Sequence, residues 1–240
     1  CSNRGQLMYY NYIIVFLCLG SLAALFFYIL KLKPNKKTDI KELYSQGLDM
    51  MINGLQRSAY NNFKKIVELD SENIKAYLRL GQVLRESGNV NKALKIHKGL
   101  LIRKNLTSYD LKELHKNLAL DYFELNNIDK AIEEASEILK VDKNNTWAIS
   151  KLIIFYKKIN QWNKASEYLE KLHKINGASD PHKLGLFIIQ EGRIFQNNKD
   201  FQLARSKFEK ALSIDPDLSS SYFFIAETFS KESEEYFQEA

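Results

Sequence analysis

The chain has 240 residues and a formal net charge of +6, from 35 Lys and Arg against 29 Asp and Glu. This length allows one or two domains with a sizeable core, and the mild positive charge, spread along the chain, argues against a nucleic-acid surface. The two cysteines, Cys1 and Cys18, can form neither a disulfide framework nor a CxxC metal knuckle. Few prolines, and little Val or Thr beside abundant Leu, Ile, Lys, Glu and Ala, favour helices over strands.

An uncharged apolar segment occupies residues 9–30, YYNYIIVFLCLGSLAALFFYIL. At about 1.5 Å per helical residue it is long enough to cross the hydrocarbon core, and tyrosines near both ends are typical of interfacial aromatic belts. We therefore predict an uncleaved transmembrane anchor. A cleavable signal peptide is the alternative, but its apolar region would be shorter and a small-residue cleavage site would follow. Cys1 resembles the start of a mature lipoprotein, although a cropped N-terminus is the interpretation that we favour.

The flanks of this segment predict its orientation. A basic, polar linker at 31–39 follows the anchor, and Pro34 ends its helix. Four lysines follow the segment and one arginine precedes it: Lys31, Lys33, Lys36, Lys37 and Arg4. The positive-inside rule then places everything after Leu30 in the cytoplasm.

The remainder of the chain contains an internal repeat. Small residues recur after each expected turn at spacings of 34, 38, 34 and 39 residues: Ala59, Ala93, Ala131, Ala165 and Ala204. Gly47, Gly81, Ala119 and Gly192 fall twelve residues before four of them, and Phe63, His97, Ala135, Leu169 and Phe208 fall four residues after. This pattern predicts antiparallel helix pairs whose small residues lie at close contacts and whose larger residues fill the space between pairs.

The repeat resembles the tetratricopeptide repeat, most clearly in GRIFQNNKDFQLARSKFEKALSIDP at 192–216. The resemblance implies an all-α fold in which antiparallel helix pairs stack into a right-handed superhelix. We expect five repeats over 40–217, at about 40–73, 74–107, 112–145, 146–179 and 185–218. Residues 219–240 would be an incomplete sixth repeat, because the sequence stops without a polar capping helix, and we expect a C-terminal truncation there.

Catalytic chemistry finds little support in the sequence. The four histidines, His97, His115, His173 and His182, form no metal-binding spacing, and there is no phosphate loop or nucleophile elbow. Asp121-Tyr122 has no evident catalytic partner. His97 takes a position usually held by Phe, which predicts a buried packing role. We therefore predict that the chain is not an enzyme and has no cofactor or metal site of its own.

Stacked helix pairs usually bind partners on a concave face lined by the first helix of each pair. A face that mixes Lys and Arg with Trp and Phe suits an acidic, hydrophobic peptide. Counting along the repeats places twelve residues there: Lys75, Leu78, Gln82, Arg85, Glu113, Lys116, Leu120, Phe123, Trp147, Ser150, Ile154 and Lys157.

A closer resemblance is carried by LGQVLRESGNVNKALKIHKGLLIRKNLT at 80–107. This stretch, an Asp-Tyr pair at 121–122 and the N-terminal anchor together resemble the lipopolysaccharide assembly protein B (LapB) family of bacteria. The matching residues of the stretch are Leu80, Gly81, Leu84, Arg85, Gly88, Ala93, Ile96 and His97.

That resemblance implies a single-pass adaptor of the bacterial inner membrane. LapB-like proteins promote degradation of the deacetylase LpxC by the membrane protease FtsH, and they contact other envelope-assembly proteins. The family also has a C-terminal rubredoxin-like metal domain, for which this sequence supplies no cysteines. Two alternatives stay open: a generic tetratricopeptide co-chaperone or assembly factor for another envelope complex, and the accessory part of an enzyme whose catalytic domain lies elsewhere.

Overall fold

The computed structural model describes residues 19–26 and 39–239 and divides into two units, one up to Leu43 and one from Tyr44 onward. Residues 19–26 are helical. Within the described residues, no helix has the length and apolar character needed to span a bilayer. Most of the predicted anchor at 9–30 and of the linker at 31–39 lies outside the described residues, so both stay predictions.

From residue 39 onward the described chain consists of helices joined by short loops, without a strand. The all-α class predicted from composition and periodicity is therefore confirmed for these residues. The helices are α2 (Ile40–Ile52), α3 (Gln56–Leu69), α4 (Ile74–Glu86), α5 (Val90–Leu100), α6 (Ser108–Glu124), α7 (Ile128–Val141), α8 (Thr146–Lys158), α9 (Trp162–Asn176), α10 (Pro181–Asn197), α11 (Phe201–Ile214) and α12 (Ser219–Glu239).

Tight turns join the helices into pairs: α2 with α3, α4 with α5, α6 with α7, α8 with α9, and α10 with α11. Each turn contains one residue with positive φ: Gly54, Gly88, Asn126, Asn160 and Lys199. The turn predicted at Gly88-Asn89 is thus found, with φ of +77° at Gly88, where glycine carries no steric penalty. Asn tolerates the same left-handed conformation at two of the other turns.

Side chains cap several first helices and so fix where each pair begins. Thr107 and Asp110 form a reciprocal capping box on α6, in which each side chain accepts from the other residue's backbone N–H. Asn73, Asn145 and Asp180 accept backbone N–H groups at the starts of α4, α8 and α10. These caps satisfy donors that the helix itself leaves unpaired.

The small residues of the repeat lie at the tightest contacts between paired helices. All five recurring alanines, Ala59, Ala93, Ala131, Ala165 and Ala204, are fully buried. A Cβ built on Gly47 would approach the Phe63 ring to 2.7 Å, and one on Gly192 would approach the Phe208 ring to 2.6 Å. The glycines therefore make room for the rings four residues after the alanines, rather than for a neighbouring backbone.

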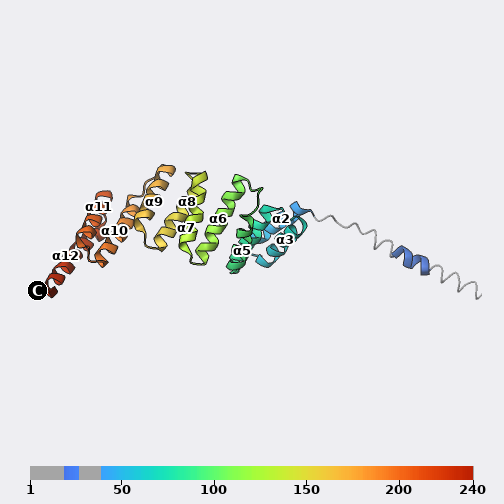
Figure 1. Ribbon diagram of the computed structural model, residues 1–240, viewed down its shortest axis with the longest axis horizontal. Coiled ribbons are helices and arrows are strands. Elements are labelled where there is room, and N and C mark those ends of the chain that lie inside the picture. Colours follow the sequence, from blue (N-terminus) through green and yellow to red (C-terminus); the bar gives the residue numbers. More distant parts are fainter. Residues whose placement is uncertain (1–18, 27–38, 240) are drawn as a thin grey trace, which may run out of the picture. The chain divides into compact units, whose positions relative to one another are not determined.

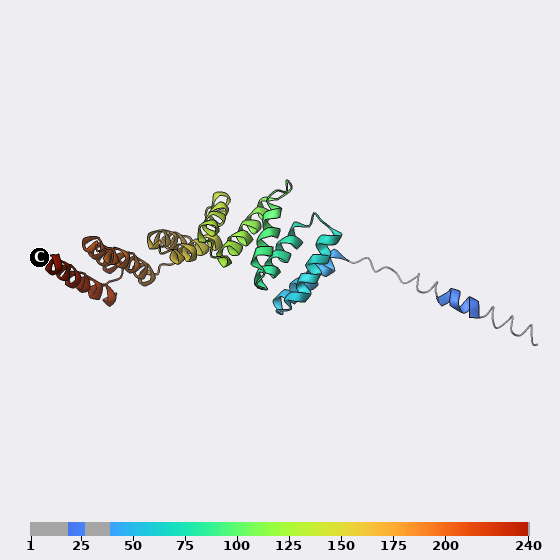
Figure 2. The same ribbon diagram turned by 60° about the horizontal axis from the view of Figure 1, so that its bottom comes forward.

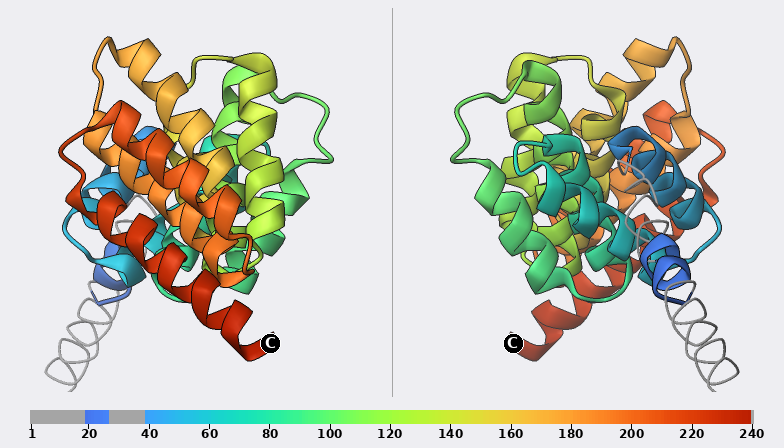
Figure 3. Two further views of the ribbon diagram at one scale, coloured as in Figure 1. Left: turned by 90° about the vertical axis from the view of Figure 1, so that its left-hand side faces the viewer. Right: turned by 90° about the vertical axis from the view of Figure 1, so that its right-hand side faces the viewer.

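Successive pairs stack in chain order, because each helix from α3 to α12 contacts the next one along the chain. The first helices of neighbouring pairs also meet, since α4 contacts α6 and α10 contacts α12 (Figure 1). Figure 2 shows the same order after rotation, and Figure 3 shows α12 beside α11. The largest core cluster spans α4 to α8 and contains Leu78, Leu114, Leu118, Leu152 and Phe155. No pair buries its apolar face without a neighbour.

Replacing Ala93 by leucine is expected to destabilise the protein by about 1–3 kcal/mol, because the side chain at this position is fully buried against the partner helix. Chemical denaturation followed by circular dichroism measures this loss. The exposed neighbour Asn91 provides the control, since Asn91→Leu should change the unfolding free energy by less than about 0.5 kcal/mol. Equal stability of the two variants would contradict the assigned contact.

Candidate functional site

A pocket of about 200 Å³ opens on the first helices of the first three pairs. We call it the first-helix pocket, and its lining residues are Tyr44, Lys75, Leu78, Arg79, Tyr109, Glu113 and Asn117. Three of these, Lys75, Leu78 and Glu113, belong to the face predicted from the sequence. Tyr44, Arg79, Tyr109 and Asn117 were missed. Both Arg79 and Asn117 could have been predicted, because each follows a residue of the predicted face by one helical turn.

The first-helix pocket offers mainly hydrogen-bond donors. Lys75 is exposed, and the Arg79 guanidinium makes one bond of 2.6 Å, to Gln82 Oε1. Arg85 donates to Oδ1 of Asn117 at 3.2 Å, and Nδ2 of Asn117 already donates to the Glu113 carbonyl at 2.9 Å, so that amide has only its second N–H to offer. The carboxylate of Glu113 is already paired with Lys116 at 2.6 Å. A ligand that accepts hydrogen bonds and carries negative charge therefore fits this pocket best.

Two predicted face residues serve the contact between pairs instead. Leu78 is only 6% exposed and belongs to the core cluster, although its side chain also borders the pocket. The Arg85 side chain is 9% exposed, and its Nη1 donates to Asp121 Oδ1 at 2.8 Å. Arg85 was interpreted as facing a partner and is instead bonded within the protein. Gln82 is half-buried and donates to Glu86.

Further along the first-helix face, the predicted residues form a row of aromatic contacts. Phe123 on α6 stacks on Phe155 of α8, with ring centroids 4.9 Å apart. Lys116 lies 5.7 Å from the centroid of the Trp147 ring, a cation–π distance. These contacts join the first helices of neighbouring pairs and leave part of the face apolar.

The four remaining residues of the predicted face differ in exposure; they are Leu120, Ser150, Ile154 and Lys157. Ile154 is 46% exposed, whereas Leu120 and Ser150 are half-buried. Lys157 lies over the rings of Trp162 and Phe187, at 5.9 Å and 5.0 Å from their centroids. Among these four, Ile154 offers the most apolar surface to a partner.

A buried polar cluster lies beneath the first-helix pocket and joins α4, α5 and α6. His97 is fully buried, as predicted, but it is not only a space filler: its Nδ1 lies 2.5 Å from Asp121 Oδ2. Its Nε2–H donates to the Leu78 carbonyl at 3.2 Å. Asp121 therefore has two partners, His97 and Arg85, neither of which was predicted from the sequence.

The proton count of this cluster follows from its geometry. A carbonyl oxygen only accepts, so Nε2 of His97 carries a proton, and the contact of Nδ1 with Asp121 holds a second. Together with the Arg85 guanidinium, the three side chains carry one net positive charge inside the protein. Each of the three side chains is hydrogen-bonded, which a buried charge needs in order to be tolerated.

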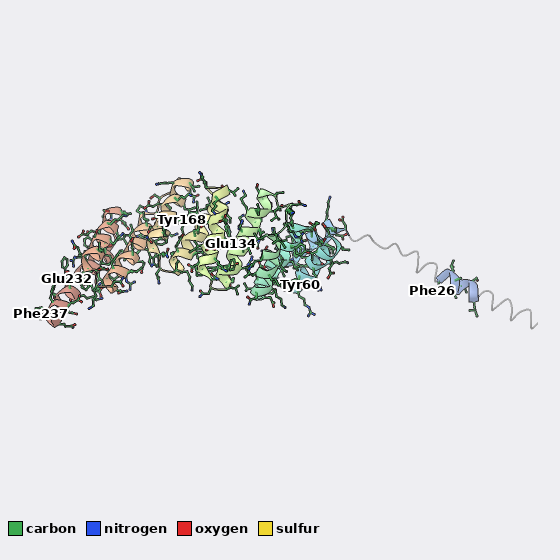
Figure 4. All side chains as sticks on the ribbon, in the orientation of Figure 1. Phe26, Tyr60, Glu134, Tyr168, Glu232 and Phe237 are labelled. Atoms are coloured by element: carbon green, nitrogen blue, oxygen red, sulfur yellow. The ribbon has the colours of Figure 1, made fainter. Side chains whose placement is uncertain are left out.

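Two tyrosines in the stacked pairs are held neutral by their surroundings. Burial raises the pKa of the Tyr122 phenol above its ordinary value, and the carboxylates of Glu134, Glu133 and Asp121 raise it further. Burial also raises the pKa of Tyr156, which stacks on Tyr168 with ring centroids 5.6 Å apart. Glu134 and Tyr168 are labelled in Figure 4. These side chains therefore contribute packing, and neither phenol acts as an anionic base at neutral pH.

Metal chemistry has no support in the part of the chain that the structure describes. No group of three or more His, Cys, Asp or Glu side chains lies close enough there to hold an ion. Two of the three other histidines pair singly: His115 with Glu134 at 2.7 Å, and His182 with Asp215 at 2.8 Å.

Comparison with known proteins agrees with this architecture. The family model described as tetratricopeptide repeat matches residues 188–218. Lipopolysaccharide assembly protein B of Haemophilus influenzae is 29% identical over 185 residues, covering 75% of this chain and 44% of the relative. The protein of the same name from Escherichia coli K12 is 22% identical over 200 residues, covering 82% of this chain and 51% of the relative.

The chain is similar to LapB over most of its length and contains a tetratricopeptide repeat at 188–218. It spans about half the length of the curated LapB relatives that it matches. The name of these relatives refers to lipopolysaccharide assembly, and the tetratricopeptide repeat is a scaffold for binding proteins.

Solved structures show the same fold for the LapB-like chain. The crystal structure of MamA superposes with a TM-score of 0.54 at 20% identity, covering 75% of this chain and 94% of MamA. YrrB, titled a tetratricopeptide-repeat protein with an unusual peptide-binding site, gives a TM-score of 0.55 at 17% identity, covering 81% of this chain and 95% of YrrB. At these identities the likeness concerns the fold alone.

Proposed function

We propose that the LapB-like chain is a cytoplasmic adaptor, anchored in the bacterial inner membrane through residues 9–30, that regulates lipopolysaccharide synthesis. In this proposal it promotes degradation of the deacetylase LpxC by the protease FtsH. The observation that carries the proposal is the alignment with lipopolysaccharide assembly protein B over 75% and 82% of the chain. Stacked helix pairs, without a metal cluster or a catalytic constellation in the described residues, suit an adaptor better than an enzyme.

The first-helix pocket supplies the physical means of binding in this proposal. Lys75, Arg79 and the Asn117 amide present donors, while Leu78 and two tyrosines present apolar surface. An acidic, hydrophobic segment of a client would place a carboxylate among the donors and an apolar side chain against Leu78. Burial of a charge-assisted hydrogen bond next to apolar contacts gives both affinity and orientation.

Depletion of the protein in its own bacterium tests the proposal. The half-life of the deacetylase, measured by immunoblotting after protein synthesis is stopped, should lengthen because its degradation slows. An unchanged half-life in a host that makes lipopolysaccharide would overturn the proposed role. That outcome would instead favour a repeat scaffold for another envelope complex.

A further inference from the structure

A second concave surface lies away from the first-helix pocket, on the second helices of the first two pairs. It is a hollow of about 670 Å³, here called the second-helix hollow. Its floor and rim include Arg57, Tyr60, Leu84, Lys92, Lys95 and Ile96. Tyr60 on α3 is labelled in Figure 4. The volume falls within the range of about 300–1,000 Å³ that is usual for binding sites.

Three cations of this hollow have no internal partner. Arg57, Lys92 and Lys95 are exposed, and throughout residues 39–239 none of their side chains makes an ion pair, hydrogen bond or cation–π contact. Lys116, on the first-helix face, is by contrast paired with Glu113. The carboxylate that bonds to the lining residue Gln56 is Glu86, which accepts from Gln56 at 3.1 Å and from Gln82 at 2.8 Å.

The helix ends at this hollow add to its positive character. α3 and α5 both begin beside it, and neither start has a side-chain cap or an acidic residue in its first turn. The positive end of each helix dipole is therefore not neutralised locally. Between these charges, Tyr60, Leu84 and Ile96 are half-buried and leave apolar surface open to the hollow.

We propose that the second-helix hollow is a docking site for an acidic amphipathic helix of a protein partner. The apolar face of such a helix would enter between Tyr60, Leu84 and Ile96. Lys92 and Lys95, spaced i,i+3 on one face of α5, would meet acidic side chains on one flank, and Arg57 of α3 would meet them on the other. A lipid bilayer fits less well, because a flat surface would touch only the rim of a hollow.

The site is separate from the proposed client pocket, so one chain could hold two proteins at once. The first-helix pocket is built from α2, α4 and α6, whereas the cations of the hollow come from α3 and α5. An adaptor that brings two proteins together requires two such surfaces. This inference does not depend on the identity of the client, because it rests on the charges and shape of the hollow.

The experiment measures fluorescence anisotropy of a labelled helical peptide with the full chain in a non-ionic detergent. The probe has about five turns, roughly 18 residues, with leucine at i, i+3, i+4 and i+7 and glutamate beside them. Lys92→Glu/Lys95→Glu should weaken binding at least about tenfold, because it replaces attraction by repulsion at the rim. Lys171→Glu/Lys174→Glu on α9, with the same charge change and spacing, should stay within about twofold of the original affinity.

Several results would overturn the proposal. These are an equal loss of affinity in the two double variants, equally tight binding of a peptide with glutamine in place of glutamate, and no binding of the probe by the original chain. Binding only to phosphatidylglycerol vesicles, with no competition by the peptide, would also overturn it. In a Lys75→Glu/Arg79→Glu background, which removes binding of acidic peptides at the first-helix pocket, Lys92→Glu/Lys95→Glu should still weaken probe binding at least about tenfold, and this result separates the hollow from the proposed client site.

Discussion

Replacement of Asp121 by alanine is expected to destabilise the protein by about 3–5 kcal/mol. The change removes the acceptor of two cationic or proton-donating groups at once, Arg85 at 2.8 Å and His97 at 2.5 Å. Because the Asp121 and His97 side chains are fully buried, water cannot replace the lost bonds without opening the contact between α4, α5 and α6. Urea denaturation followed by circular dichroism measures the loss.

Two companion variants show whether the buried cluster is the cause. Glu133→Ala, at an exposed position on α7, should change stability by less than about 0.5 kcal/mol. A triple variant, Arg85→Met, His97→Phe and Asp121→Leu, should recover much of the loss, because it replaces the whole charged set by apolar groups. Phe is accommodated opposite glycine in two other pairs, at Phe63 and Phe208. An Asp121→Ala variant as stable as Glu133→Ala would contradict the cluster.

Gly81→Ala is expected to destabilise the protein toward the upper end of the ~1–3 kcal/mol typical of overpacking. A Cβ at this position would lie 2.3 Å from Nε2 of His97. The ring cannot move aside easily, because Asp121 holds Nδ1 and the Leu78 carbonyl holds Nε2. Thermal denaturation and urea denaturation both report the change.

Gly99 on α5 provides the matched control for Gly81, since a Cβ there would meet nothing within 4 Å. Gly99→Ala should stabilise the protein by about 0.5–1 kcal/mol, because alanine favours the helix and costs no contact. If Gly81→Ala stabilised the protein in the same way, the close approach of His97 to α4 would be refuted.

The repeat could be predicted from the sequence because its signal is local. The recurring alanines, the residues twelve before them and the residues four after them lie on one helix pair, and in three pairs the structure brings a glycine of this pattern against a ring. The turn at Gly88 could also be predicted locally, because it breaks an otherwise helical pattern. Helical periodicity is enough to assign these roles.

The buried cluster could not be predicted because its members come from different pairs. Asp121 lies 24 residues after His97, across a loop whose length breaks the 34-residue spacing. Two signals were present but were not combined. A histidine at an aromatic position needs a polar partner, and an aspartate inside the apolar run LALDYF needs one as well.

The exposure of individual side chains on the first-helix face could not be predicted from the sequence either. The count along each helix assigned Lys75, Leu78 and Glu113 to one face, and these three residues line the first-helix pocket. It could not tell that Leu78 is in the core or that Arg85 pairs with Asp121, because the distance to the next pair decides both. Register along one helix predicts direction, but it does not predict what lies opposite.

The abundance of the deacetylase in depleted cells that are complemented with defined variants tests the proposed adaptor role most directly. The account predicts that the original protein and the Lys171→Glu/Lys174→Glu control restore rapid degradation. The Lys75→Glu/Arg79→Glu variant should leave the deacetylase abundant, because its first-helix pocket repels an acidic client. Full restoration by that variant would contradict client binding at the first-helix pocket, and a deacetylase level unaffected by depletion would contradict the adaptor role itself.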